Sequence, residues 1–209
     1  MEELRESGVV TKIRYTEWPQ FEPLVRRILE EGRVEGDRIL KIDHFINHRI
    51  EPSFMRVLGQ ALAERIAPYE PDLLLTAEAS GIAPALATAM ALDVDLVYAK
   101  KYSPLAAPVS YSRLVPSPTK GVDSLLAVSG LYIREGMRVA LIDDFLANGR
   151  TAIALAEIVA DAGAHPVVAA FLVEKLFQGG RRGIEALDIP VVALASIDRL
   201  ENGRVIMAE

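Results

Sequence analysis

The sequence has no cysteine at any of its 209 positions. Disulfide bridges, thiolate-ligated metals and cysteine nucleophiles are therefore excluded, and the chain is compatible with a reducing compartment. The sequence also lacks an apolar run long enough to span a bilayer, and its charged N-terminus has no apolar signal-peptide stretch. We therefore expect a soluble cytoplasmic protein.

Positive charge is in the minority, because 23 Lys and Arg residues face 29 Asp and Glu residues, for a net charge of −6. The chain as a whole lacks the positive field that attracts nucleic-acid backbones, so we expect neither a nucleic-acid nor a membrane partner. What is present is a globular composition, 51% hydrophobic and 25% charged. This length fits one main domain with a sizeable core.

Strand-like and helix-like apolar patterns alternate along most of the chain. Short apolar runs suited to buried strands occupy residues 72–77, 94–99, 138–143, 166–173 and 190–196, and residues 38–45 also look extended. Helical patterns occupy residues 21–31, 53–67, 82–92, 151–162 and 180–187. In the first of these helices, Leu24, Val25, Ile28 and Leu29 form one apolar stripe. The alternation predicts an α/β fold with a mainly parallel sheet flanked by helices.

Residues 101–130 interrupt this alternation with four prolines and several serines. We interpret this segment as a long excursion beside the sheet, for which a hairpin is one possible form. Such long excursions often carry function.

A buried strand at Val139–Ile142 runs directly into two adjacent carboxylates, Asp143 and Asp144. Open α/β sheets bind ligands at this edge, and two adjacent like charges there indicate a site for hydroxyls or a cation. Next, Gly149 lets backbone approach a ligand, and the free N–H groups of a helix opened by Thr151 form an anion seat. A phosphorylated sugar would satisfy both halves of this site.

An ordinary structural explanation is also open at this point. Asp144 would then cap the helix, and Asn148 and Gly149 would form a simple turn.

The stretch "VALIDDFLANGRT" (139–151) resembles the phosphoribosyl pyrophosphate signature of the type I phosphoribosyltransferases. Segments 38–52, 78–101, 126–130 and 174–181 are similar to further segments of that family in the same order. The resemblance covers about residues 21–209 and leaves residues 1–20 as an extension of unknown role. It implies a sheet domain with a small hood built from N-terminal and C-terminal segments.

The resemblance also implies an activity, namely transfer of 5-phosphoribosyl from phosphoribosyl pyrophosphate to a purine base in purine salvage. Among the purine bases, the resemblance favours xanthine. The alternatives are adenine, hypoxanthine or guanine, or a non-catalytic regulator that senses phosphoribosyl pyrophosphate. Magnesium would ride on the pyrophosphate without a direct protein ligand, and the family is usually dimeric. We expect residues 102–124 to form a lid that excludes water from the activated sugar.

Roles for single residues follow from the same resemblance. Asp143 and Asp144 would hold the ribose hydroxyls, and Ala147, Asn148, Gly149, Arg150 and Thr151 would wrap the 5-phosphate. Ala79, Ser80 and Gly81 would meet the pyrophosphate, which Lys100 and Lys101 would neutralise. Leu40, Asn47 and Lys175 would contact the base. For two of these basic residues another interpretation is open. Arg150 could simply point outward, and Lys175 could be a surface lysine with a buried stem.

Overall fold

The computed structural model describes residues 18–36, 38–101, 110–115 and 124–208. The described strands are β1 (Arg33–Glu35), β2 (Ile39–Lys41), β3 (Leu73–Ala77), β4 (Asp95–Lys101), β5 (Ser110–Val115), β6 (Ser124–Ser129), β7 (Arg138–Leu146), β8 (His165–Lys175), β9 (Val191–Glu201) and β10 (Arg204–Met207). The described α-helices are α1 (Glu22–Glu31), α2 (Pro52–Ile66), α3 (Ile82–Leu92), α4 (Arg150–Asp161) and α5 (Gly180–Glu185), and short 3-10 turns lie at Ala67–Tyr69 and Leu176–Gln178.

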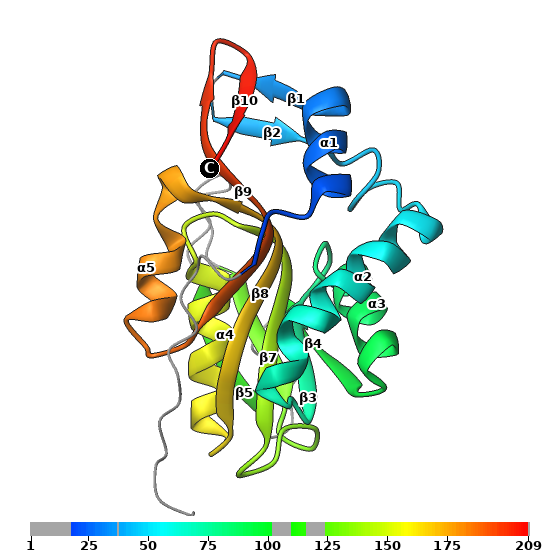
Figure 1. Cartoon of the computed structure of the whole chain (residues 1–209). Coiled ribbons are helices and arrows are strands. Elements are labelled where there is room, and N and C mark those ends of the chain that lie inside the picture. The colour runs from blue at the N-terminus through cyan, green and yellow to red at the C-terminus, as the bar shows by residue number, and fades with distance from the viewer. Residues whose placement is uncertain (1–17, 37, 102–109, 116–123, 209) are drawn as a thin grey trace, which may run out of the picture.

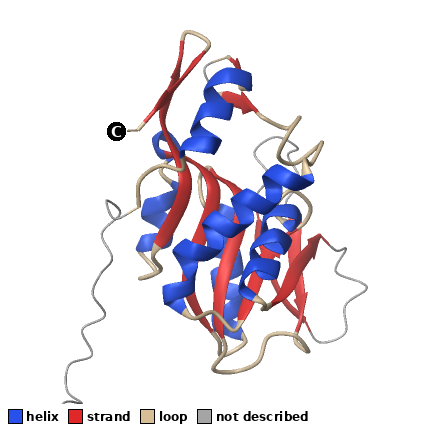
Figure 2. Cartoon of the chain, turned by 45° about the vertical axis from the view of Figure 1, so that its right-hand side comes forward, coloured by secondary structure: helices blue, strands red, loops and turns tan. Residues whose placement is uncertain are grey.

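Eight of the described strands form one sheet in the order β10-β9-β8-β7-β3-β4-β6-β5. The five central strands, from β9 to β4, are mutually parallel, whereas β10, β6 and β5 add antiparallel edges. Helices α2 and α3 cover one face, and α4 and α5 cover the other (Figures 1 and 2). The predicted α/β fold with a mainly parallel sheet is therefore confirmed.

Each face of the sheet has its own apolar core, because the parallel strands are buried on both sides. The larger core joins the sheet to α2 and α3 and continues into the N-terminal elements, where Leu24, Leu40 and Phe45 are buried. The second core joins the sheet to α4 and includes Leu155 and Phe171.

A hood made of α1, the β1–β2 hairpin and the β9–β10 hairpin stands at one end of the sheet (Figure 1). The Phe21 amide donates to the Leu194 carbonyl oxygen at 2.7 Å, which ties the start of α1 to β9. N-terminal and C-terminal segments thus build one structure, as the resemblance implied.

Some local predictions differ from the structure. Leu29 is 54% exposed, whereas Leu24 and Ile28 are fully buried, so the predicted stripe was wrong at Leu29. The extended segment 38–45 contains only the short β2, and residues 43–49 turn instead. The patterns also missed β1 and β10, because these short strands have mixed sequences and are defined by their pairing partners.

The excursion after β4 contains a hairpin, in which β5 pairs antiparallel with β6 over its whole length. Arg113 on β5 forms salt bridges with Glu157 at 2.8 Å and Asp161 at 2.6 Å, so this edge strand is tied to α4. The rest of the predicted lid, residues 102–109 and 116–123, lies outside the described residues. No described helix has the length and apolarity needed to cross a membrane.

The end of the N-terminal extension is integrated into the domain. Arg65, only 5% exposed, donates to the carbonyl oxygens of Ala193 at 2.5 Å and Pro19 at 2.6 Å. Its guanidinium carbon lies 5.7 Å from the centroid of the Trp18 ring, and the Gln20 side chain accepts from the Ser196 amide at 2.9 Å. Residues 18–20 are therefore a structural strap across α2 and β9, while residues 1–17 lie outside the described residues.

The strap generates a stability prediction. Replacing Arg65 by Met leaves two carbonyl groups without this donor, which costs about 2 kcal/mol or more at about 1–3 kcal/mol per group. A loss of about 2 kcal/mol lowers the melting temperature by roughly 4–8 °C in a chain of this size. Arg56→Met on the exposed side of the same helix is the matched control. Equal melting temperatures in the two variants would contradict the strap.

Candidate active site

Predicted site residues from separate segments meet at one edge of the sheet. Strand β7 ends with Asp143 and Asp144 near its carboxyl end, and β3 ends just before the loop 78–81. The parallel neighbours β4 and β8 end at Lys101 and Lys175. Because parallel strands place their carboxyl ends together, the sheet topology gathers the two carboxylates, the two lysines and the loop 78–81 at this edge.

The Asp144 side chain is 5% exposed and links three parts of the chain. One of its oxygens, Oδ2, accepts from the Asn47 side-chain amide at 2.5 Å. The other, Oδ1, accepts from the Ser80 hydroxyl at 3.0 Å and from the Phe145 amide at 2.9 Å. These donors lie before α2, in the loop after β3 and within β7, so the alternative in which Asp144 caps α4 is not what the structure shows.

The Asp143 carboxylate lies against the loop after β3. A Cβ atom added at Gly81 would be 2.6 Å from Asp143 Oδ1 and would collide with the Thr76 hydroxyl, so only glycine fits there. Burial raises the pKa of Asp143 well above its usual value near 3.8, and the charge of Asp144 adds to the effect, while Lys101 opposes it. The fully buried Thr76 hydroxyl has no hydrogen-bond partner among the described residues. This corner thus combines an unpartnered hydroxyl, a tightly enclosed glycine and a carboxylate with a raised pKa.

The loop between β7 and α4 encloses a hollow of about 70 Å³ lined by Asp143, Phe145–Ala152 and Phe171. Gly149 has φ +77°, a left-handed conformation suited to glycine, and α4 begins at the next residue. Asn148 does make a local turn, since its side-chain oxygen accepts from the Arg150 amide at 3.1 Å. Arg150 itself is exposed. The local turn predicted as the alternative is therefore present, and the anion-binding role of this loop stays a prediction.

Two residues predicted to contact the base differ in burial. Lys175 is half-buried, with its ammonium 5.0 Å from the centroid of the Phe145 ring. Burial lowers the pKa of Lys175, and the negative charge of Asp144 acts in the opposite direction. Leu40 is 5% exposed and packs within the hood near Gly32, so it belongs to the core beneath the site.

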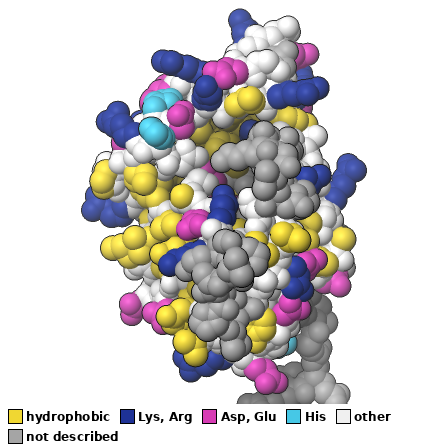
Figure 3. All heavy atoms as spheres, turned by 180° about the vertical axis from the view of Figure 1, so that it is seen from behind, with side chains coloured by type: hydrophobic (Ala, Val, Ile, Leu, Met, Phe, Trp, Pro, Cys, Tyr) yellow, Lys and Arg dark blue, Asp and Glu magenta, His cyan; other side chains and the backbone are white. Residues whose placement is uncertain are grey.

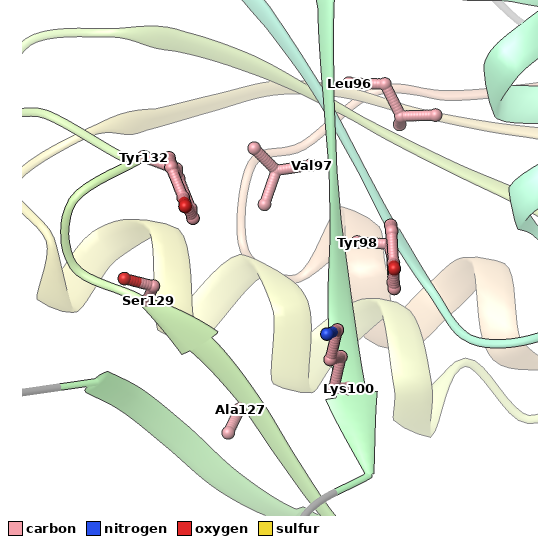
Figure 4. Close-up of a pocket in the computed structure, with 7 residues that line it drawn as sticks. All are labelled: Leu96, Val97, Tyr98, Lys100, Ala127, Ser129 and Tyr132. Carbon is pink, nitrogen blue, oxygen red and sulfur yellow. The ribbon is translucent and has the colours of Figure 1, made fainter. Parts of the chain in front are cut away.

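The structure separates the two predicted lysines of β4. The Lys101 amide donates to the Glu78 carboxylate at 2.5 Å, beside the loop 78–81. Lys100 lines a different cavity of about 440 Å³, in which its ammonium lies 5.6 Å from the Tyr98 ring centroid. Figure 4 shows this cavity between β4 and β6, with Ser129 and Tyr132 on its other side. None of the other predicted site residues lines this cavity.

Sequence reasoning missed an ion pair directly behind the site. Glu174, 1% exposed, forms a salt bridge with Arg181 through two hydrogen bonds. Both residues lie in a segment singled out above, and a glutamate at the end of an otherwise apolar strand is the signal that could have found the pair.

The comparisons with known proteins agree with this geometry. The family model of the phosphoribosyl transferase domain matches residues 45–198. The chain is 54% identical to the xanthine phosphoribosyltransferase of Chloroflexus aurantiacus over 88% of this chain and 87% of that protein. It is 42% identical to the xanthine phosphoribosyltransferase of Oenococcus oeni over 89% and 91% of the two chains. The solved adenine phosphoribosyltransferase of Leishmania tarentolae superposes with a TM-score of 0.69 over 85% of this chain and 89% of that one, at 21% identity, a likeness of fold alone.

The strained position of Asp143 generates a second stability prediction. Replacing Asp143 by Asn removes a buried like-charge repulsion, and each 1 kcal/mol relieved raises the melting temperature by about 2–4 °C. Because folding raises the pKa of Asp143, the folded wild type binds more protons than the unfolded chain above pH 3.8. Wild-type stability is therefore lost as the pH rises through the raised pKa.

The advantage of Asp143→Asn should thus be absent at acid pH and grow towards neutral pH, as measured by thermal unfolding across that range. Asp95→Asn, at an exposed position at the start of β4, is the control. An advantage that shrinks with rising pH would contradict the prediction.

Proposed function

The chain belongs to the phosphoribosyltransferase family, and on that premise we propose that it transfers 5-phosphoribosyl from phosphoribosyl pyrophosphate to xanthine. The products would be xanthosine monophosphate and pyrophosphate. The observation that carries the proposal is the convergence of the aspartate pair, the loop 78–81 and Lys175 at one sheet edge. The 54% identity to a protein named xanthine phosphoribosyltransferase supports the choice of base.

The reaction breaks the bond between ribose C1 and a pyrophosphate oxygen and forms a bond between C1 and a purine nitrogen. Positive charge develops on the ribose and negative charge on the leaving group. We assign Asp143 and Asp144 to the ribose hydroxyls, where their carboxylates favour the developing positive charge. The hydrogen bonds from Asn47 and Ser80 hold Asp144 in place, so this charge requires little reorganisation.

The two anionic ends of the substrate would occupy separate loops. We assign the 5-phosphate to the hollow around Ala147–Thr151, where Gly149 brings backbone close. We assign the pyrophosphate to Ala79, Ser80 and Gly81, with Lys101 beside them to neutralise charge. Lys100 lies in a different cavity, so we propose that Lys101 carries the larger part of this role.

Magnesium fits this site by the chemistry of its donors. Magnesium would bind the oxygen atoms of the pyrophosphate rather than a protein ligand, and the Asp143, Asp144 and Ser80 oxygens near the proposed subsites suit the surroundings of such a complex. When bound on the pyrophosphate, magnesium would neutralise charge that develops on the leaving group.

The base would lie between Lys175 and Asn47, with Leu40 supporting the hood behind it. An ammonium donates hydrogen bonds but cannot accept them, so Lys175 suits the ring oxygen of xanthine, hypoxanthine or guanine. Adenine presents an amino donor and is less suited to the same position. We therefore propose adenine as the poorest substrate of the four bases.

Three further expectations accompany this function. We propose that residues 102–124 serve as a lid, of which β5 is the described part. We propose that residues 21–209 act as one catalytic domain, to which the strap at residues 18–20 adds. A cytoplasmic location stays a prediction from the sequence.

We also propose a homodimer. Val57, Leu86, Met90 and Tyr98 are exposed apolar side chains on α2, α3 and β4, and Met90 is 77% exposed. Figure 3 shows hydrophobic side chains gathered along this edge of the molecule. In a symmetric homodimer, these exposed apolar side chains would be covered by the same surface of the second copy.

The function is tested by measuring nucleotide formation from phosphoribosyl pyrophosphate, magnesium and each of xanthine, hypoxanthine, guanine and adenine. Xanthine should give the highest kcat/KM. Lys175→Met should lower kcat/KM for xanthine by about 100-fold, since a site that loses a donor to a base oxygen loses both binding and discrimination. The KM for phosphoribosyl pyrophosphate should change little, because Lys175 lies outside both phosphate loops.

Asp143→Asn serves as the inactive reference, because it should lose turnover while it gains stability. If the protein binds phosphoribosyl pyrophosphate but forms no nucleotide from any base, its function would be that of a sensor rather than an enzyme. A preference for adenine that survives in Lys175→Met would contradict the assignment of the base site.

The dimer is tested by replacing Met90 with Glu and measuring mass in solution by sedimentation equilibrium. Wild-type protein should be dimeric, and Met90→Glu should raise the dissociation constant by about 100-fold or more, since a buried charge without a partner costs several kcal/mol. Leu187→Glu, at an exposed apolar residue beyond α5, is the control. A monomeric wild type, or dissociation by the control alone, would contradict this face as the interface.

A further inference from the structure

The buried ion pair between Glu174 and Arg181 lies directly behind the proposed phosphate and base subsites. Arg181 Nε donates to Glu174 Oε1 at 2.7 Å, and Arg181 Nη2 donates to the other carboxylate oxygen. A third guanidinium nitrogen, Nη1, donates to the Val191 carbonyl oxygen at 2.9 Å. The forked guanidinium therefore joins β8, α5 and the start of β9 with fixed geometry.

Arg181 follows the glycine that forms the back wall of the loop 147–149. The Gly180 amide donates to the Ala147 carbonyl oxygen at 3.1 Å. A Cβ atom added at Gly180 would lie 2.6 Å from the Gly149 nitrogen, and one added at Gly149 would lie 2.8 Å from the Gly180 carbonyl oxygen. The two backbones are in direct contact, so the position of α5 sets the position of the loop.

Glu174 is also adjacent in sequence to a residue of the proposed base subsite. It precedes Lys175, and its strand partners are Leu146 on β7, the residue before Ala147, and Ser196 on β9. Strand alternation directs the Glu174 and Lys175 side chains to opposite faces of the sheet. Arg181 holds Glu174 on the face of the sheet opposite to the proposed ligand. The bond between them therefore also limits the movement of the neighbouring Lys175.

A buried ion pair is a weak source of stability, because well-packed apolar side chains of similar volume often stabilise a protein equally well or better. What the bidentate pair adds is orientation. We propose that Arg181 and Glu174 are positioning residues that hold the 5-phosphate loop, and with it Lys175, in the binding geometry. This proposal rests on the function proposed above.

Three variants separate positioning from stability. Arg181→Met leaves the Glu174 carboxylate buried without its partner, so both stability and ligand binding should fall. The double variant Glu174→Gln and Arg181→Met removes that buried charge, so its melting temperature should recover most of the loss while α5 remains unanchored. The remaining loss reflects the Val191 carbonyl, which no longer has its donor. Arg138→Met is the control, because Arg138 bonds the carbonyls of Tyr69 and Glu70 at the opposite end of β7.

The probes are ribose 5-phosphate, magnesium pyrophosphate and phosphoribosyl pyrophosphate, studied by calorimetry and by turnover well below the melting temperatures. In the double variant, affinity for ribose 5-phosphate should fall and KM for phosphoribosyl pyrophosphate should rise, each by about 10- to 100-fold, since small misplacements of a binding group have effects of this size. Affinity for magnesium pyrophosphate should stay within about twofold of wild type, because α5 packs chiefly against α4 and β9, whereas the loop 78–81 follows β3.

Ligand affinities in the double variant that equal those of Arg138→Met would overturn the proposal, since the pair would then act on stability alone. Equal losses for ribose 5-phosphate and magnesium pyrophosphate would also overturn it, as they indicate general distortion. Wild-type protein that forms no nucleotide but binds both ligands would overturn the proposed reaction, while the comparison of the two ligands would still decide the role of Arg181.

Discussion

The Asp144 carboxylate is the interaction on which the organisation of this site depends. Its two oxygens accept hydrogen bonds from Asn47, from Ser80 and from the backbone of β7. These donors come from the segment between the hood and α2, from the loop after β3 and from the strand that carries the aspartates. One side chain thereby connects the proposed base, pyrophosphate and ribose subsites. A carboxylate can accept from all three donors because both of its oxygens are acceptors, whereas the amide of an asparagine has a single acceptor oxygen.

The second carboxylate shows what this arrangement costs. Asp143 is held beside Asp144 in a partly buried position, and both burial and the neighbouring charge raise its pKa. Glycine at position 81 and the unpartnered Thr76 hydroxyl belong to the same corner. A fold selected for stability alone would avoid these features, and they are consistent with the ligand site proposed above. The fully bonded Glu174–Arg181 pair behind the loop supplies rigidity to the opposite side.

Much of the fold could be predicted because local pattern and tertiary environment agree. The strands β3, β7, β8 and β9 read as apolar runs because they are largely buried on both faces, and the intervening helices show their own period. The strand β4 also has an apolar run, although Ala99 is its only buried residue. Prediction from the sequence failed where contacts with distant segments determine the local structure or burial. Leu29 matches an apolar stripe but faces solvent, and the short β1 and β10 exist because the hood pairs each of them with another segment.

The sequence by itself determined the chemistry that this protein can perform, because the aspartate pair, the glycine-containing loop and the helix after it are contiguous from residue 139 to 162. Local chain geometry alone brings these groups together. Only the tertiary structure decided which distant residues serve them. It placed Asn47 on Asp144, kept Lys101 beside the ligand loop while directing Lys100 into another cavity, and put Arg181 on Glu174. The physical reason is that such contacts depend on strand order, side-chain alternation and burial, and these are properties of the assembled sheet rather than of any one segment.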